Sequence, residues 1–253
     1  MTNQTALVTG AASGIGFAVA KDLCLKGYNV LVSDLNEQHA NEAAESLRSS
    51  GGDAEAYRLD VSSQNEIENL FEQAAPIDIL VNNAGLQHVA KLEEFPVDTW
   101  KLLIDVLLTG PAMLARAALP GMKARNFGRV INIGSIHSLI ASPYKSAYVA
   151  AKHGLLGFSK TLALETAEHD ITVNTICPAY VRTALVDQQI TDQAKTHGIS
   201  EQEVIDNIML QPMPKKSFIS PEEICGTVSY LISDAARNMT GQQVVLDGAW
   251  TAR

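Results

Sequence analysis

Near its amino end the sequence reads Thr5-Ala-Leu-Val-Thr9 and continues as Gly10-Ala-Ala-Ser-Gly14-Ile-Gly16. The first five residues are mostly apolar or β-branched, which is typical of a buried parallel strand. A helical pattern follows Gly16. Gly10 permits a tight turn, Gly14 lets the backbone approach a pyrophosphate, and Gly16 lets the helix pack close to the strand. The first amides of that helix then face an anion. An ordinary glycine-rich turn is the alternative, but strand, glycines and helix together favour a dinucleotide site.

A carboxylate at the end of the next strand-like run indicates which dinucleotide would bind. Asn29-Val-Leu-Val-Ser33 is typical of a second strand, and Asp34 follows it, 18 residues after Gly16. A carboxylate there can accept hydrogen bonds from both ribose hydroxyls of an adenosine, and it would repel a 2′-phosphate. No Arg or Lys lies in the glycine loop or at positions 35–36. We therefore expect NAD rather than NADP, the alternative for Asp34 being a cap or a turn residue.

A tyrosine and a lysine four residues apart, Tyr148 and Lys152, mark a candidate catalytic helix. This spacing places both side chains on one helix face, one turn apart. There we expect the ammonium to lower the pKa of the phenol from about 10, so that the phenol exchanges a proton near neutral pH. Ser135 ends the strand-like run before this helix, where its hydroxyl can stabilise charge that develops on a substrate oxygen. A strand-end cap is the alternative for Ser135, and a solvated helix face for the pair.

Strand-like and helical segments alternate along the whole chain. That alternation predicts a parallel sheet with helices on both faces and ligands beyond the carboxyl ends of the strands. No linker rich in glycine, serine or proline divides the 253 residues, so we expect one domain. Further strands are expected near 77–82, 128–134, 171–177 and 243–247, and helices near 37–49, 64–74, 98–125, 145–167 and 221–233.

Composition excludes several other classes of protein. A net charge of −9 and a pI near 5.1 argue against nucleic acid and anionic membranes as partners. No apolar run approaches the roughly 20 residues that span a bilayer, and Met1-Thr-Asn-Gln has no basic region typical of a signal peptide. Cys24, Cys177 and Cys225 lie within apolar runs, as expected for buried thiols in a reducing cytoplasm. The six histidines show no metal-ligand spacing, so we expect no catalytic metal.

Six motifs in a fixed order make the sequence resemble the short-chain dehydrogenase/reductase family along essentially its whole length. The resemblance implies a single-domain Rossmann-type fold, with a doubly wound parallel sheet of about seven strands and helices on both faces. The motifs, in chain order, are Gly10 to Gly16, Asp60-Val61, Asn82-Asn-Ala-Gly85, Ser135, Tyr148 with Lys152, and Pro178. A plain turn is the alternative for the two asparagines, because Asn tolerates left-handed geometry.

The resemblance also implies roles for individual residues. Ser135, Tyr148 and Lys152 would be catalytic, with Tyr148 as the general base. A larger set, drawn from the glycine loop, the strand ends and the catalytic helix, would bind NAD: Gly10, Ser13, Gly14, Ile15, Gly16, Asp34, Asp60, Val61, Asn83, Ala84, Gly85, Tyr148, Lys152, Pro178, Val181 and Thr183.

Within this family the chain most resembles the bacterial D-3-hydroxybutyrate dehydrogenases. That likeness implies reversible NAD-dependent oxidation of (R)-3-hydroxybutyrate to acetoacetate. A four-carbon acid offers little apolar area, so charge-assisted hydrogen bonds must supply affinity and orientation. By resemblance, Gln87, His137, Lys145 and Gln189 would hold the carboxylate. The full substrate-binding set is Gln87, Ser135, His137, Lys145, Tyr148, Tyr180 and Gln189.

Three positions depart from the family pattern. Ala179 replaces a common glycine, Tyr180 replaces the usual tryptophan near the substrate methyl group, and Leu107 replaces an asparagine that helps hold a proton-relaying water. Alternatives to the hydroxybutyrate reaction are a 3-oxoacyl thioester reductase using NADPH and a dehydrogenase of another alcohol. Leu107 motivates a third, a dinucleotide-binding sensor without catalysis.

The stretch from about 183 to 217 is too polar and irregular for core. We expect it to be a lid that closes over the substrate and excludes water; the alternative is a surface excursion that serves subunit contacts. By resemblance the protein would be a homotetramer, with the helices near 98–125 and 145–167 and the segment Val244 to Arg253 at interfaces.

Overall fold

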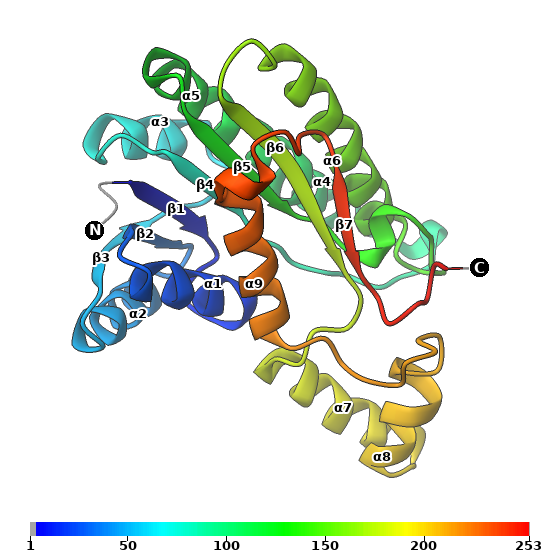
Figure 1. Cartoon of the computed structure of the whole chain (residues 1–253). Coiled ribbons are helices and arrows are strands. Elements are labelled where there is room, and N and C mark those ends of the chain that lie inside the picture. The colour runs from blue at the N-terminus through cyan, green and yellow to red at the C-terminus, as the bar shows by residue number, and fades with distance from the viewer. Residues whose placement is uncertain (1–3, 253) are drawn as a thin grey trace.

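A seven-stranded parallel sheet forms the centre of the computed structural model, which describes residues 4–252 and their side chains apart from those of Leu185 and Thr196. The strand order is β3-β2-β1-β4-β5-β6-β7 (Figure 1). The expectations for Met1–Asn3 and Arg253 lie outside the described residues. The strands are β1 Thr5–Thr9, β2 Asn29–Asp34, β3 Asp53–Arg58, β4 Ile79–Asn82, β5 Gly128–Ile133, β6 Ile171–Pro178 and β7 Gln243–Leu246.

Helices cover both faces of this sheet. One apolar cluster joins α1, α2 and α9 to one face, and a second joins α3, α5 and α6 to the other. The predicted single-domain, doubly wound fold is confirmed, and most predicted element ends agree within two residues. The α-helices are α1 Gly14–Leu25, α2 Glu37–Ser49, α3 Gln64–Gln73, α4 Val97–Ile104, α5 Gly110–Arg125, α6 Ser146–Glu165, α7 Ala184–His197, α8 Glu201–Val204 and α9 Pro221–Ile232.

The helix expected near 98–125 is interrupted by a π-helical stretch, Asp105–Thr109, between α4 and α5. If the π-helical stretch is included, the helix Val97–Arg125 is long and apolar enough to cross a membrane, by length and composition alone. This differs from our expectation that the chain has no such segment. One side of it packs inside the protein, where Leu103, Leu107 and Leu114 are at most 1% exposed, whereas Val97 and Leu102 are exposed. Such a core helix is weak evidence for a membrane span.

The segment expected to be a lid forms a separate lobe below the carboxyl end of β6 (Figure 1). It holds α7, α8 and a π-helical stretch, Ile205–Met209. The expectation that it contributes no core is wrong, because Ile190, Ala194, Val204 and Met209 form a small apolar cluster of their own. The stems of the lobe are joined by a parallel bridge between Val181 and Ile219.

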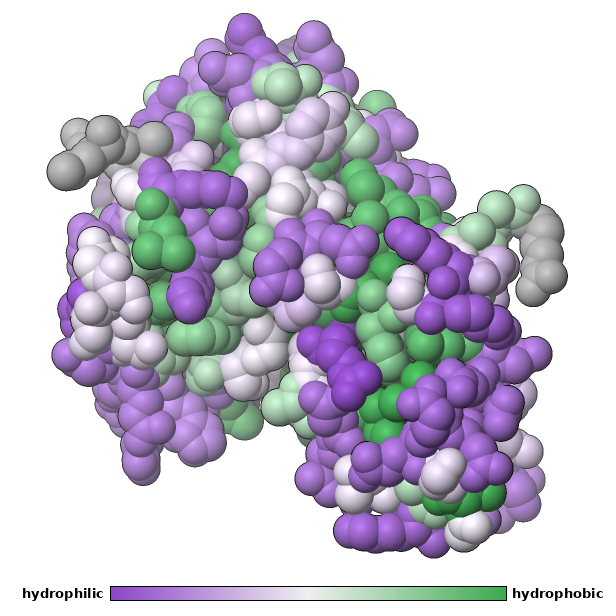
Figure 2. Space-filling model, turned by 60° about the horizontal axis from the view of Figure 1, so that its bottom comes forward, coloured by the Kyte–Doolittle hydropathy of each residue, from purple (hydrophilic) through white to green (hydrophobic). Residues whose placement is uncertain are grey.

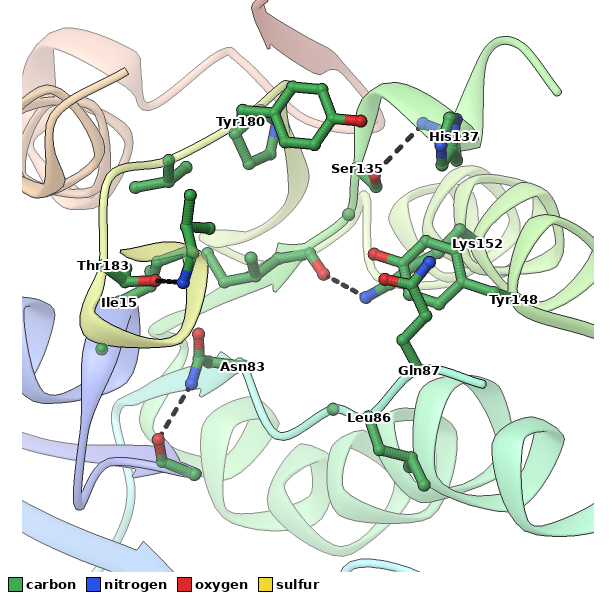
Figure 3. A pocket seen from close by; sticks show the side chains of 18 of the residues that line it. Ile15, Asn83, Leu86, Gln87, Ser135, His137, Tyr148, Lys152, Tyr180 and Thr183 are labelled. Carbon is green, nitrogen blue, oxygen red and sulfur yellow. Dashed lines mark hydrogen bonds between the residues drawn. The ribbon is translucent and has the colours of Figure 1, made fainter. Parts of the chain in front are cut away.

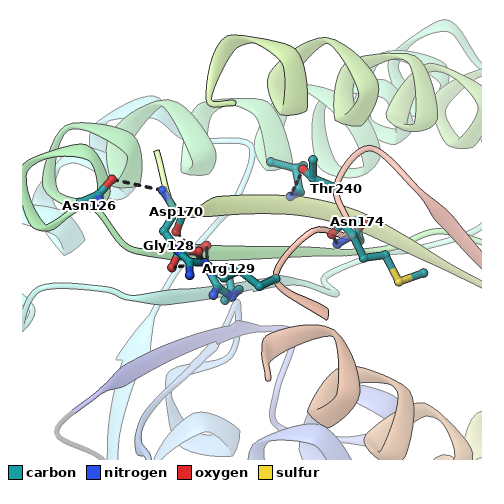
Figure 4. Close-up of polar contacts among 9 residues, drawn as sticks. Asn126, Gly128, Arg129, Asp170, Asn174 and Thr240 are labelled. Atoms are coloured by element: carbon teal, nitrogen blue, oxygen red, sulfur yellow. Dashed lines mark hydrogen bonds and ion pairs between the residues drawn. The ribbon is translucent and has the colours of Figure 1, made fainter. Parts of the chain in front are cut away.

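A buried ion pair fixes the sheet at the end opposite the lid (Figure 4). Arg129 at the start of β5 is fully buried, and its Nη1 lies 3.1 Å from Oδ1 and 2.9 Å from the backbone oxygen of Asp170. Arg237 reaches the other carboxylate oxygen of Asp170 at 3.2 Å. Removing one partner of such a pair leaves an uncompensated buried charge, so this cluster ties the amino ends of β5 and β6 together.

Candidate active site

The carboxyl ends of the strands open into one cavity of about 470 Å³ between the sheet and the lid lobe. β1 and β4 are neighbours in the sheet, and the strand order reverses between them, which is where ligands bind in such folds. Seen from this side, apolar surface follows the depression beside the lid lobe (Figure 2). Most of the predicted cofactor and substrate residues therefore line one cavity.

The glycine loop has the geometry that a dinucleotide pyrophosphate requires. Gly10 and Gly14 have φ of 61° and 56°, values that favour glycine. A Cβ on Gly16 would lie 2.3 Å from the Gly10 oxygen and 2.4 Å from the Asn83 side chain, so only glycine allows this close packing. Among the described residues, no side-chain cap hydrogen bond from Ser13 occupies the first amides of α1. These amides thus remain available for an anion.

Asp34 stands beside the glycine loop at the end of β2. Its Oδ2 accepts a hydrogen bond from the Ala12 amide at 3.3 Å, and its Oδ1 accepts one from the Asn36 amide at 3.1 Å. The carboxylate is therefore held at the edge of the cavity, with oxygen lone pairs left for further donors.

Asn83 connects the segment after β4 to the glycine loop. Its side-chain nitrogen donates to the backbone oxygens of Thr9 at 2.9 Å and Gly10 at 3.1 Å. The Thr9 hydroxyl in turn accepts hydrogen bonds from the Asn83 and Ala84 amides at 3.0 Å. This segment is thus more than a plain turn, because it locks the end of β4 onto the glycine loop.

Ser135, Tyr148 and Lys152 line the same cavity (Figure 3). The lysine Nζ lies 5.8 Å from the centre of the tyrosine ring and donates a 2.7 Å hydrogen bond to the Ile133 oxygen. Ser135 caps a 3-10 turn, Ile136–Ser138, by accepting a hydrogen bond from the His137 amide at 3.1 Å. The capping interpretation of Ser135 is therefore correct, yet its hydroxyl still faces the cavity and keeps its own proton to donate.

The environment of Tyr148 differs from our expectation. Burial raises the pKa of the Tyr148 phenol above 10, and the hydrogen bond with Ser135 lowers it by less. Burial also lowers the pKa of Lys152 to about 8. The expectation that the ammonium lowers the pKa of the phenol is therefore wrong for this structure, because burial of Tyr148 has the largest effect.

The four predicted carboxylate-binding residues all line this cavity: Gln87, His137, Lys145 and Gln189. Lys145 Nζ lies 3.5 Å from Nε2 of His137. Burial, helped by the ammonium of Lys145, lowers the pKa of His137 to about 4, and burial also lowers the pKa of Lys145. The histidine is thus neutral near pH 7 beside a lysine that carries the local positive charge.

Trp250 is a lining residue that the sequence interpretation missed. Its ring is stacked on that of Tyr180, with ring centroids 6.2 Å apart and planes at 20°. It also makes a T-shaped contact with the His137 ring, with centroids 6.3 Å apart. Trp250 follows the carboxyl end of β7 by four residues. That position is the signal which could have found it, because ligands gather at the carboxyl ends of parallel strands.

Some predicted residues lie outside the cavity lining: Gly16, Asp60 and Val61. Gly16 is at the packing contact between α1 and the loop, and the Val61 side chain belongs to the core on the α5 face. An oxygen of Asp60 accepts hydrogen bonds from the amide and the hydroxyl of Ser62, in the turn before α3. Leu107, by contrast, does line the cavity, and it is 1% exposed.

Comparison with known proteins agrees with this geometry. The family model for short-chain dehydrogenases matches residues 4–194. The D-beta-hydroxybutyrate dehydrogenase of Rhizobium meliloti is 44% identical over 99% of both chains, and that of Cupriavidus necator is 41% identical over the whole of both. An actinorhodin polyketide ketoreductase solved with NADPH is 33% identical, with a TM-score of 0.92 over 99% of this chain and 98% of its own.

Fold and site together define an oxidoreductase that uses a nicotinamide dinucleotide. The chain belongs to the short-chain dehydrogenase/reductase family.

Proposed function

We propose that this protein oxidises (R)-3-hydroxybutyrate to acetoacetate, reversibly and with NAD. The observation that carries the proposal is the Lys145–His137 pair at 3.5 Å, which shares a cavity with Ser135 and Tyr148. A cation beside a neutral imidazole suits a carboxylate, because the lysine supplies charge and the histidine a directed N–H. The two relatives named as hydroxybutyrate dehydrogenases, which align over almost the whole chain, support the same substrate.

The preference for NAD is supported by the edge of the cavity near Asp34. Its carboxylate is fixed by the Ala12 and Asn36 amides, and the residue that follows it is Leu35, which is 62% exposed. A 2′-phosphate placed there would meet the negative charge of Asp34 and an apolar side chain.

In the proposed reaction Tyr148, Ser135 and Lys152 have separate roles. Tyr148 takes the proton of the substrate hydroxyl, and Ser135 donates a hydrogen bond to the same oxygen. Lys152 stabilises the phenolate that forms and holds the nicotinamide ribose. A nicotinamide dinucleotide bound by these residues would supply the hydride acceptor for C3 of the substrate.

The polar residues Gln87 and Gln189 come from different parts of the fold. Gln87 follows β4, whereas Gln189 comes from α7 of the lid lobe. We propose that closure of the lid, residues 183–217, brings Gln189 onto the carboxylate and excludes water. The small apolar cluster holds α7, α8 and the stretch Ile205–Met209 together, and the bridge between Val181 and Ile219 joins the two ends of the lobe.

We also propose a homotetramer that uses the outer faces of α5 and α6. Met113, Leu119 and Phe158 line a hollow of about 360 Å³ there, and Leu164, also on α6, is 80% exposed. An apolar face of this kind is typical of an interface between copies. Light scattering of the purified protein tests it; a monomer would contradict it.

A substrate and cofactor screen tests the reaction. We expect turnover with (R)-3-hydroxybutyrate and NAD, and much weaker turnover with NADP. Tyr148→Phe should lose turnover while NAD still binds, and Lys145→Ala should chiefly raise the KM for the acid. An unchanged KM in that variant would remove Lys145 from the carboxylate site.

One rival function is favoured by a specific finding. The ketoreductase solved with NADPH shares 33% of its sequence with this chain, so a reductase of 3-oxoacyl thioesters remains the second candidate. The charged Lys145–His137 end of the cavity argues against it, because a thioester has no carboxylate at that place. Faster turnover of 3-oxoacyl thioesters with NADPH than of hydroxybutyrate with NAD would favour the rival.

A further inference from the structure

Ser135 is held by a second serine that no part of the proposed reaction uses. The hydroxyl of Ser138 accepts a hydrogen bond from the Ser135 amide at 3.2 Å, and the Ser138 amide donates to the Ser135 oxygen at 2.8 Å. Both backbone polar groups of Ser135 therefore end on Ser138. The two residues form a reciprocal pair across the 3-10 turn that follows β5.

The direction of the Ser135 hydroxyl follows from this arrangement. One lone pair of its Oγ accepts the His137 amide at 3.1 Å, so rotation about the Cα–Cβ bond is restrained. The remaining freedom is the orientation of the Ser135 backbone itself, which Ser138 fixes from both sides. A rotation of that backbone by a few tens of degrees would move Oγ by roughly 1 Å, a displacement that can cost about 100-fold in rate.

The Ser138 side chain is buried and closely packed. It is 2% exposed, and a Cβ on Gly134 would lie 3.0 Å from its Oγ and 3.1 Å from the Sγ of Cys177. The Ser138 hydroxyl and the Ser135 amide both act to lower the pKa of the Cys177 thiol, against a larger effect of burial that raises it. The Ser138 hydroxyl thus bridges the Ser135 amide and the Cys177 sulfur.

We propose that Ser138 is a positioning residue, which aims the Ser135 hydroxyl at the reacting oxygen of the substrate. It acts through Ser135 alone and touches neither substrate nor cofactor; among the described residues it is absent from the cavity lining. The proposal rests on one part of the proposed function, namely that Ser135 assists the oxidation of an alcohol or the reduction of a carbonyl group. It does not depend on which alcohol is the substrate.

The test is a double-mutant cycle between Ser138→Ala and Ser135→Ala. Ser138→Ala should lower kcat roughly 10- to 100-fold and leave the dissociation constant for NAD within about twofold, since the cofactor cradle is untouched. In the Ser135→Ala background the same change should have almost no further effect on kcat, because Ser138 then has no hydroxyl to aim. Ser138→Cys keeps the shape with a weaker acceptor, so it should give an intermediate rate.

A control separates positioning from general damage. Thr166→Val removes an equally buried hydroxyl at the end of α6, about 27 Å along the helix from Tyr148. It should lower the melting temperature without lowering kcat. If the rate losses of Ser138→Ala and Ser135→Ala simply multiply, Ser138 acts on structure in general and the proposal is wrong.

The substrate assignment and the positioning role fail in different ways. If 3-hydroxybutyrate is not turned over but another alcohol is, the function proposed above fails and the cycle is measured on that alcohol. If no alcohol is turned over, a crystal structure of Ser138→Ala still tests the inference. We expect Ser135 Oγ to be displaced or disordered there, and an unchanged Oγ would overturn the proposal.

Discussion

Lys152 is expected to weaken the folded protein near neutral pH, and its replacement by methionine measures the effect. Burial lowers the pKa of Lys152 from 10.5 to about 8 in the protein without cofactor. Between these two values the unfolded chain binds more protons than the folded one, so stability rises with pH across this range. Below pH 8 the penalty for the buried ammonium is fully present.

The size of the effect follows from linkage. Lowering the pKa from 10.5 to about 8 corresponds to a penalty of about 3 kcal/mol at pH 7 and of only about 1 kcal/mol at pH 9.5. Lys152→Met removes this penalty, but it also leaves the Ile133 oxygen without its 2.7 Å donor, at a cost of about 1–3 kcal/mol that does not depend on pH. The stability of the variant relative to the parent should therefore fall by about 2 kcal/mol from pH 7 to pH 9.5.

Urea unfolding of both proteins without cofactor, at the two pH values, provides the measurement. The exposed Lys160 on the same helix gives the control, and the relative stability of Lys160→Met should be equal at both pH values. A difference between the Lys152 variant and the parent that stays constant with pH would refute the reasoning. It would mean that the lysine is solvated in the folded state.

Three further outcomes are expected. Gly16→Ala should abolish NAD binding in calorimetry, because the new Cβ would lie 2.3 Å from a backbone oxygen of the glycine loop, whereas Gly226→Ala, with nothing within 4 Å, should be tolerated. Trp250→Ala should shift the ratio of kcat/KM roughly 10-fold towards 3-hydroxy acids with longer chains, because an aromatic wall of the cavity is lost; an unchanged ratio would remove it from the substrate site. Asp170→Ala should lower the free energy of unfolding by about 3–5 kcal/mol, since the buried Arg129 loses its counter-ion; a loss below about 1 kcal/mol in urea unfolding would contradict that.

Much of the site could be predicted from the sequence because its residues follow strand ends or share a helix face. Gly10, Ser135 and Tyr148 occupy such positions, and the fold brings them to one edge of the sheet. Trp250 was missed because it lies far along the chain from every motif and reaches the cavity only through the pairing of β7 with β6. The pKa of Tyr148 was expected in the wrong direction because spacing shows proximity to Lys152 but not how far water is excluded.

The sequence by itself determined the order of strands and helices, the glycine loop and the spacing of Tyr148 and Lys152. These are local properties, set by periodicity, backbone freedom and side-chain chemistry over a few neighbouring residues. Only the tertiary structure decided the burial of Lys152, the position of Ser138 next to Cys177 and the stacking of Trp250 on Tyr180. Each of these depends on which distant segments pack together and how much water they exclude, and a linear pattern does not carry that information.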